Sequence, residues 1–334
     1  METRPFSRSS EEMKQNYESS LAYFGDKDPK TAGFEKGVRA TAFATAKLLA
    51  EFVEDEGELA KRFYENGMEL IKPEGEVPET GSPYFIELRY KSSEKIISQM
   101  AEKFGEIQVV ELASGFTPHG MSMTMRRPEV KKWIDNDFEA SLSIKQNVVN
   151  NIAGGMPIEY VPGSVLEQTT WDKIESRLDQ DLPVVVFCEG LMMYFTKEDR
   201  QKFYNHIHQI IGKHGGAFFH EDILKYQKDN EEIERGRSSD DFRCITQQIR
   251  EISGGQNNPA LGEFYTQEEV ASEYEENGFN IERVSERDLA ELSLDKYPEE
   301  KKIKTATIDH TLHPRQNGED LLKADFKMWI AYLK

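Results

Sequence analysis

The sequence predicts an α/β fold, a doubly wound and mostly parallel sheet that follows an α-helical N-terminal segment. Short apolar stretches alternate with segments of helical periodicity over the middle of the chain, which is typical of successive right-handed βαβ units. The stretch 183–190, PVVVFCEG, is the most apolar of them, as a central strand covered on both faces should be. In 108–120, QVVELASGFTPHG, a short strand runs into a small-residue turn and then a helix, an arrangement that presents backbone N–H groups to a nucleotide-like ligand.

Composition limits the classes of partner. The chain has 334 residues and a formal net charge of −19, an excess of acid that disfavours nucleic acid and anionic membrane surfaces. Cys188 and Cys244 cannot build a disulfide framework and have no metal-ligand spacing, which fits a reducing compartment. No stretch reaches the length of apolar residues that a membrane span needs. We therefore expect a soluble, cytoplasmic protein; its oligomeric state is left open.

The N-terminal third is predicted to be a helical cap. Apolar residues recur at three- and four-residue spacing from 17 to 70, and the segment 72–85, with three prolines, indicates an exposed loop. A further helix is expected over 87–105, ELRYKSSEKIISQMAEKFG. We accordingly divide the chain into a cap at 1–83 and an α/β domain at 84–334.

Within the α/β domain, strands are expected at 108–112, 131–137, 158–164, 183–190 and 215–222, with helices between them. Thr196, with Asp199 three residues later, is predicted to cap the helix after the fourth strand. The charged segment 223–264 then interrupts the alternation and is interpreted as a helical insertion that acts as a lid. A capped helix at 266–278 and two strands, 279–286 and 325–334, complete the sheet, and the last strand is expected to be antiparallel.

Several pieces of sequence together resemble one family. ELASGFTPHG (111–120) resembles the first glycine motif of class I S-adenosylmethionine-dependent methyltransferases, and WIDNDFEASLSIK (133–145) resembles their acid-ended second strand with its helix. CEGLMMYFTKEDRQKFY (188–204) resembles the fourth-strand signature of the leucine carboxyl methyltransferase and tetracenomycin-type polyketide O-methyltransferase group. ELRYKSSEK (87–95) is similar to that group's arginine-bearing helix. The likeness covers roughly 84–225, the helix at 266–279 and the terminal strand.

The resemblance implies a seven-stranded Rossmann-like sheet, S-adenosylmethionine as cofactor, and methyl transfer to a carboxylate or hydroxyl of a small molecule, polyketide-like or another metabolite. It implies that Arg89 meets the cofactor's carboxylate, that Asp137 holds the ribose diol with Asp135 as the alternative, and that Glu189 faces the amino-acid end. The residues expected to bind the cofactor are Arg89, Glu111, Ala113, Gly115, Asp137, Ser164, Val165, Glu189 and Gly190.

The turn departs from the family's pattern at several positions. The family usually has glycine where this chain has Ala113, an acid at Thr117 and arginine at His119; an acid is also common at Ser164. Losing one glycine is tolerable if the turn keeps a negative φ. These departures leave open an altered cofactor affinity or a changed ligand.

Two residues are candidates for chemistry on the acceptor side. Tyr194 could bring a hydroxyl from the end of the fourth strand, and His220, at the end of the fifth, could act as a base or contact the substrate. His220, Glu221 and Asp222 are adjacent on a strand and so point to alternate faces, which makes them a poor metal site, and no metal is expected.

Two other functions remain as alternatives. One is a non-catalytic or altered-ligand binding module on the same fold. The other is a nicotinamide-dependent oxidoreductase, against which the turn lacks G-x-G-x-x-G because the third glycine position falls on Pro118.

Overall fold

The computed structural model describes residues 45–47, 49–50, 57–71, 83–192, 195–221, 267–285 and 327–334. The helices with defined bounds are α3 (Gly57–Ile71), α4 (Pro83–Phe104), α5 (His119–Arg126), α6 (Glu139–Ile152), α7 (Gln168–Glu175), α8 (Lys197–His214) and α11 (Gln267–Glu276). The strands are β1 (Ile107–Leu112), β2 (Val130–Asp137), β3 (Ile158–Pro162), β4 (Val184–Cys188), β5 (Gly216–Glu221), β6 (Phe279–Ser285) and β7 (Lys327–Leu333).

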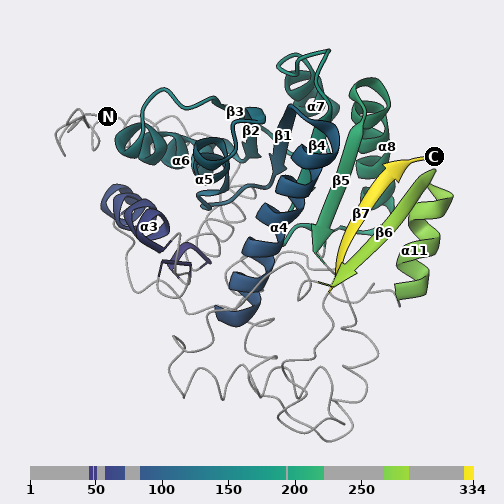
Figure 1. Ribbon diagram of the computed structural model, residues 1–334, viewed down its shortest axis with the longest axis horizontal. Coiled ribbons are helices and arrows are strands. Elements are labelled where there is room, and N and C mark those ends of the chain that lie inside the picture. The colour runs from purple at the N-terminus through teal and green to yellow at the C-terminus, as the bar shows by residue number, and fades with distance from the viewer. Residues whose placement is uncertain are drawn as a thin grey trace, which may run out of the picture.

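The strands form one seven-stranded sheet in the order β3-β2-β1-β4-β5-β7-β6 (Figure 1). β1 to β5 pair in parallel, whereas β7 is antiparallel to both of its neighbours, β5 and β6. The predicted fold class and the predicted antiparallel final strand are therefore confirmed. The order reverses between β1 and β4, because the chain builds outward from β1 in one direction and then returns to build in the other.

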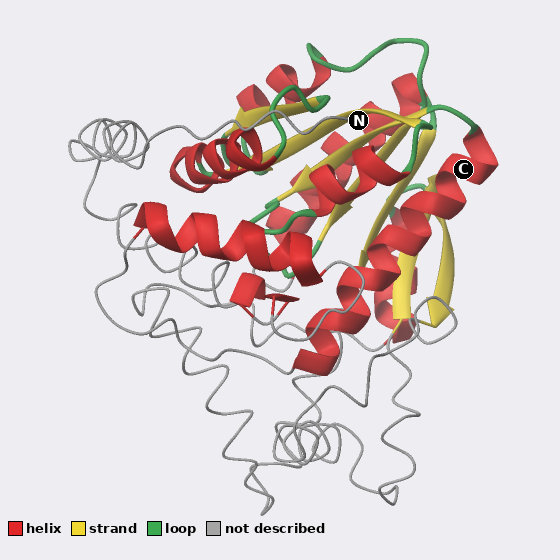
Figure 2. Ribbon diagram, turned by 60° about the vertical axis from the view of Figure 1, so that its left-hand side comes forward, coloured by secondary structure: helices red, strands yellow, loops and turns green. Residues whose placement is uncertain are grey.

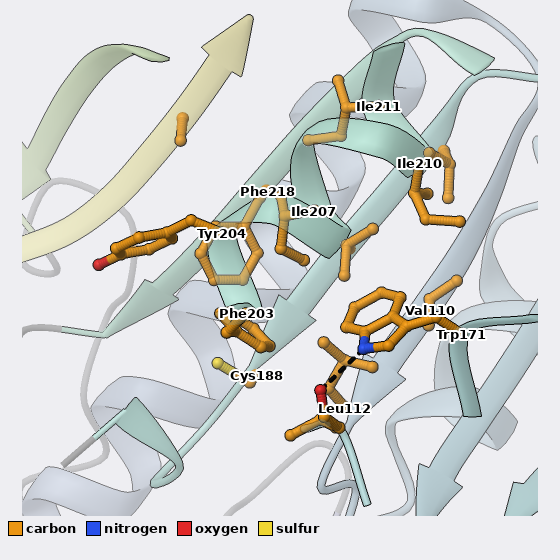
Figure 3. Close-up of a cluster of buried hydrophobic side chains, with 14 of the residues drawn as sticks. Val110, Leu112, Trp171, Cys188, Phe203, Tyr204, Ile207, Ile210, Ile211 and Phe218 are labelled. Atoms are coloured by element: carbon orange, nitrogen blue, oxygen red, sulfur yellow. Dashed lines mark hydrogen bonds between the residues drawn. The ribbon is translucent and has the colours of Figure 1, made fainter. Parts of the chain in front are cut away.

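Helices cover both faces of the sheet (Figure 2). Because strand side chains alternate, Val110, Val186 and Phe218 face α7, α8 and α11, while Val109 and Phe187 face α4 and α5. Figure 3 shows the first of these cores, where the indole of Trp171 in α7 packs in the cluster and donates a 2.7 Å hydrogen bond from Nε1 to the carbonyl of Val165. β4 is buried along its whole length, as its apolar sequence predicts.

Two helix starts show how local sequence sets the elements. α4 begins at Pro83, inside the segment predicted to be a loop; proline is favoured in the first turn because its missing N–H would have no partner there. α8 begins as predicted, since the Thr196 side chain accepts a hydrogen bond from the amide of Asp199.

The part of the cap that is described packs beside the site. α3 lies against α6, and Phe63 of α3 contacts Phe116, in the turn after β1, with ring centroids 4.5 Å apart. The predicted lid at 223–264, Tyr194, Cys244 and the first 44 residues lie outside the described residues. Among the helices that are described, none combines the length and the apolar character that crossing a membrane requires.

Candidate functional site

The candidate site lies at the carboxyl edge of the sheet, where β1 and β4 are neighbours and the strand order reverses. The turn after β1 is held by the amide of Ser114, which donates to the carbonyl of Asn136 at 2.9 Å. Ala113 and Gly115 both have positive φ, 50° and 52°. The condition under which the loss of this glycine would be tolerable, a negative φ, is therefore not met at Ala113. The backbone needs this conformation to turn sharply from the strand, and a residue with a Cβ adopts it at a cost of about 1–2 kcal/mol.

Asp137 ends β2 directly beside this turn. Its Oδ2 accepts a 2.7 Å hydrogen bond from the amide of Gly115 and its Oδ1 accepts one of 2.6 Å from the amide of Phe138. Burial raises the pKa of Asp137, while these two amides and Lys145 lower it. The carbonyl of Asp137 also accepts from the amide of Gly163, so the loop that carries Ser164 and Val165 is tied to the same point.

Asp135, the alternative ribose ligand, has a different environment. Its Oδ1 accepts 3.0 Å hydrogen bonds from Trp133 Nε1 and from Lys145 Nζ, and its side chain is almost fully buried. Asp135 Oδ2 is also buried and has no hydrogen-bond partner among the described residues, whereas both oxygens of Asp137 accept from backbone amides. Asp137 ends β2 beside the turn, and this position is the ground on which it stays the predicted ribose ligand.

Glu111, Lys145 and Asp135 form a buried charge cluster beneath the turn. Lys145 Nζ lies 3.6 Å from Glu111 Oε2 and also donates to the carbonyl of Ser114 at 3.3 Å. Burial raises the pKa of Glu111 to about 8, although Lys145 and His119 lower it. Burial lowers the pKa of Lys145, but Asp135 and Glu111 raise it above its usual value. The lysine therefore stays charged and ties the turn to the ends of β1 and β2.

Glu189, directly after β4, has three partners. Its Oε2 lies 3.2 Å from Arg89 Nε, and its Oε1 accepts from Ser93 Oγ and lies 3.1 Å from His119 Nε2. Burial would raise the pKa of Glu189, but His119 and Arg89 lower it to about 2. Arg89 and Glu189, expected together at the amino-acid end of a cofactor, are thus brought into direct contact.

His119 lies between two acids at the start of α5. Its Nδ1 is 3.7 Å from Glu94 Oε1, and its ring stacks on Tyr90 with centroids 4.0 Å apart. Burial lowers the pKa of His119, but the carboxylates of Glu189 and Glu94 raise it to about 10. The imidazole is therefore a cation at neutral pH, and it supplies a positive charge at the position where the resembling family has arginine.

The remaining predicted residues differ in how they are placed. Gly190, with φ 65°, donates its amide to Glu221, and a Cβ there would lie 3.5 Å from Arg89 Nη1. His220 points away from Arg89 and Glu189, into the core on the side of the sheet that α11 covers. Its Nε2 contacts Tyr274 Oη at 2.5 Å, and its Nδ1 contacts the carbonyl of Glu221. Burial lowers the pKa of His220 to about 4. A base role for His220 stays a prediction, which this placement does not favour.

Four residues that contact the predicted site residues were not themselves predicted to bind the cofactor or to act in catalysis: Ser93, His119, Lys145 and Glu221. His119 carried a signal, because it stands where the family has arginine. Glu221 carried one too, because it neighbours His220 and must face the other side of the sheet. Ser93 and Lys145 had none, since their partners are distant in sequence. In the described part of the chain, no group of three or more acidic, histidine or cysteine residues is arranged to hold a metal ion.

Comparison with known proteins establishes the fold and no family. No protein-family model matches the chain, and no curated protein matches it. Among solved structures, a DUF574 family protein from Streptomyces avermitilis has a TM-score of 0.50 at 10% identity over 88% of this chain and 97% of that one. The chain has a Rossmann-like α/β fold with a mostly parallel seven-stranded sheet.

Two other solved structures match over long stretches. The CurJ carbon methyltransferase has a TM-score of 0.46 at 13% identity, over 96% of this chain and 70% of that one. An O-methyltransferase family protein from Burkholderia thailandensis has a TM-score of 0.43 at 12% identity, over 84% of this chain and 61% of that one. This chain therefore spans about three fifths of the length of that protein.

Proposed function

We propose that the chain is an S-adenosylmethionine-dependent O-methyltransferase that acts on a carboxylate or hydroxyl of a small molecule, within the group that its fourth-strand motif resembles. The observation that carries the proposal is the convergence of Asp137, the 113–115 turn and the Arg89–Glu189 pair at the point where the strand order reverses. Ligands of open α/β sheets bind at such points.

The residues present fit this cofactor. Buried polar atoms at the edge have no hydrogen-bond partner among the described residues, and Ser114 Oγ in the turn is one of them. The turn itself consists of small residues, and its tight backbone brings its amides close to the edge of the sheet. A polar ligand with both donors and acceptors suits such a set.

Each residue then has a role that its environment supports. Asp137, anchored by two amides, would accept the hydrogen bonds of a ribose diol. Arg89 would meet a carboxylate, and its pairing with Glu189 through Nε sets the plane of the guanidinium. Val165 is buried, and its carbonyl is held by Trp171, so the 163–165 loop is a fixed wall for a base.

S-adenosylmethionine supplies a methyl group that is already activated by its sulfonium. The protein therefore contributes mainly orientation and exclusion of water. A residue that removes a proton is needed only if the acceptor is a hydroxyl.

Calorimetry tests the proposal against its alternatives. S-adenosylmethionine and S-adenosylhomocysteine should bind, and NADH should not. If NADH binds and S-adenosylhomocysteine does not, the chain is a nicotinamide-dependent oxidoreductase instead. Binding of S-adenosylhomocysteine, but no methyl transfer to any of a broad panel of small acids and alcohols, would favour the non-catalytic module.

A further inference from the structure

Glu221 is the last residue of β5, and its side chain lies among the groups of the candidate site. The preceding residue, His220, pairs in register with Cys188, so Glu221 is level with the loop that carries Glu189 and Gly190. It shares its face of the sheet with Phe219, which stacks on Phe187 beneath α4 with ring centroids 5.0 Å apart. Glu221 therefore points to the side where Arg89 lies, opposite to His220.

The two carboxyl oxygens of Glu221 differ. Oε1 accepts a hydrogen bond from the amide of Gly190, which fixes the side chain. Oε2 is buried and has no hydrogen-bond partner among the described residues, and the whole residue is only 2% exposed. Leaving a buried oxygen unpaired costs about 1–3 kcal/mol, and folded proteins rarely do so without a reason. A ligand that donates a hydrogen bond would remove this cost.

Glu189, the neighbouring acid, differs from Glu221 because both of its oxygens have partners. Glu189 is bound by Arg89, Ser93 and His119, which compensate its charge and satisfy its oxygens. For Glu221, burial raises the pKa to about 7, with Arg89 lowering it and Glu189 raising it. One acid at this edge thus stays ionised and organises Arg89 and His119. The other is poised between its two protonation states near neutral pH, as an acid–base catalyst should be.

We propose that Glu221 is the catalytic base of the methyl transfer and that the acceptor is a neutral hydroxyl compound rather than a carboxylate. The inference rests on the proposed function. A hydroxyl can donate to Oε2, whereas a carboxylate acceptor would bring a second negative charge against the ionised form of Glu221. In the step, the hydroxyl oxygen forms a bond to the methyl carbon as the carbon–sulfur bond breaks. The electron pair of that bond stays on sulfur, and the hydroxyl proton passes to Glu221 Oε2 and then to water.

The experiment compares wild type with Glu221→Gln, which keeps the size of the side chain and an oxygen for the Gly190 amide. Transfer of a radiolabelled methyl group is measured to matched aromatic probes, phenol and catechol against benzoate and salicylate. We expect wild type to methylate hydroxyl oxygens with a rate that rises with pH through an apparent pKa near 7. Glu221→Gln should lower that rate by about 10²-fold or more and lose this pH dependence. Glu282→Gln, an exposed position on β6, is the control.

Calorimetry separates the possible failures. Glu221→Gln should bind S-adenosylhomocysteine and methylthioadenosine as wild type does. If Glu221→Gln binds S-adenosylhomocysteine more weakly than wild type does but binds methylthioadenosine equally well, Glu221 contacts the amino-acid end of the cofactor and the proposal is overturned. It is also overturned if carboxylates are the groups methylated, or if S-adenosylhomocysteine binds but no hydroxyl probe is methylated. If wild type binds no S-adenosylhomocysteine, the proposed function itself fails.

Discussion

Nε2 of His119 lies 3.1 Å from Oε1 of Glu189, a contact that joins the first turn of α5 to the loop after β4. The two residues are 70 positions apart and come from the two halves of the sheet that meet at the candidate site. Their opposite charges lock the site's edges together, because each is buried and each shifts the other toward its charged form.

This pair predicts a pH dependence of stability. The pKa of His119 in the folded protein, about 10, is above its ordinary value of 6.5, so its contribution is complete below pH 6.5 and is lost as the pH rises toward 10. His119 alone should lower the unfolding free energy over this window by at most about 1.4 kcal/mol per pH unit, and Glu111 and Glu221, whose pKa values are raised to about 8 and about 7, should add to the fall in its lower part. His119→Arg should flatten the slope, since arginine stays charged. Urea unfolding between pH 6 and 10 measures both.

His208→Gln, at an exposed position of α8, is the control for this series and should keep the wild-type slope. His119→Gln should cost about 1–3 kcal/mol at pH 6, because Glu189 keeps Arg89 and Ser93 as partners. Identical slopes for wild type and His119→Arg would contradict a charged imidazole.

Asp137→Asn should weaken binding of both S-adenosylhomocysteine and methylthioadenosine at least tenfold, because both ligands carry the ribose that this carboxylate would hold. Calorimetry provides the measurement. Glu159→Gln, on the neighbouring strand, pairs only with partly exposed Lys132 and Arg177 in the contacts seen and should change little. Wild-type affinity in Asp137→Asn would remove Asp137 from the site.

Arg89→Ala should discriminate between the two ligands. Methylthioadenosine lacks the amino-acid end and should bind as it does to wild type, whereas S-adenosylhomocysteine should lose about tenfold to a hundredfold. Lys91→Ala, on the same helix and paired with Glu87, is the matched control. If both ligands lose affinity equally, Arg89 supports the fold through Glu189 instead of contacting the ligand.

Lys145→Met should destabilise the protein by about 3–5 kcal/mol, because it leaves the buried Asp135 carboxylate without its cation. Lys131→Met offers a direct comparison, since Lys131 pairs with Glu106 at an exposed position where an ion pair contributes less than about 1 kcal/mol. Urea unfolding of the two variants at pH 7 gives both numbers. If Lys145→Met loses as little stability as Lys131→Met, the buried cluster of Glu111, Lys145 and Asp135 does not stabilise the turn.

Ala113→Gly should stabilise the protein slightly or leave it unchanged, by about 0–1 kcal/mol. Glycine relieves the left-handed strain at φ 50°, and its greater freedom in the unfolded chain offsets part of the gain. Ala140→Gly, in the first turn of α6, should instead lose up to about 1 kcal/mol. Thermal unfolding measures the stability of both variants. If Ala113→Gly loses as much stability as Ala140→Gly, the backbone at Ala113 is not strained.

Much of the fold follows from local pattern. Alternation of apolar strands with helical periodicity predicted the parallel sheet, and the acids at strand ends, Asp137 and Glu189, predicted which edge carries the site. These features are local, because the periodicity of an element and the residue at its end can both be read from a few neighbouring positions.

Only the tertiary structure decided how the site residues meet. Ser93 and Glu189 are 96 positions apart, and no pattern in either segment indicates the other. Strand alternation showed that His220 and Glu221 face opposite sides, but not which side faces α4 and the site. Likewise, the φ of Ala113 follows from the amide of Ser114 bonding to β2, and the charge of His119 follows from two acids on other elements. Packing sets these quantities, since each depends on groups that only folding brings within a few ångströms.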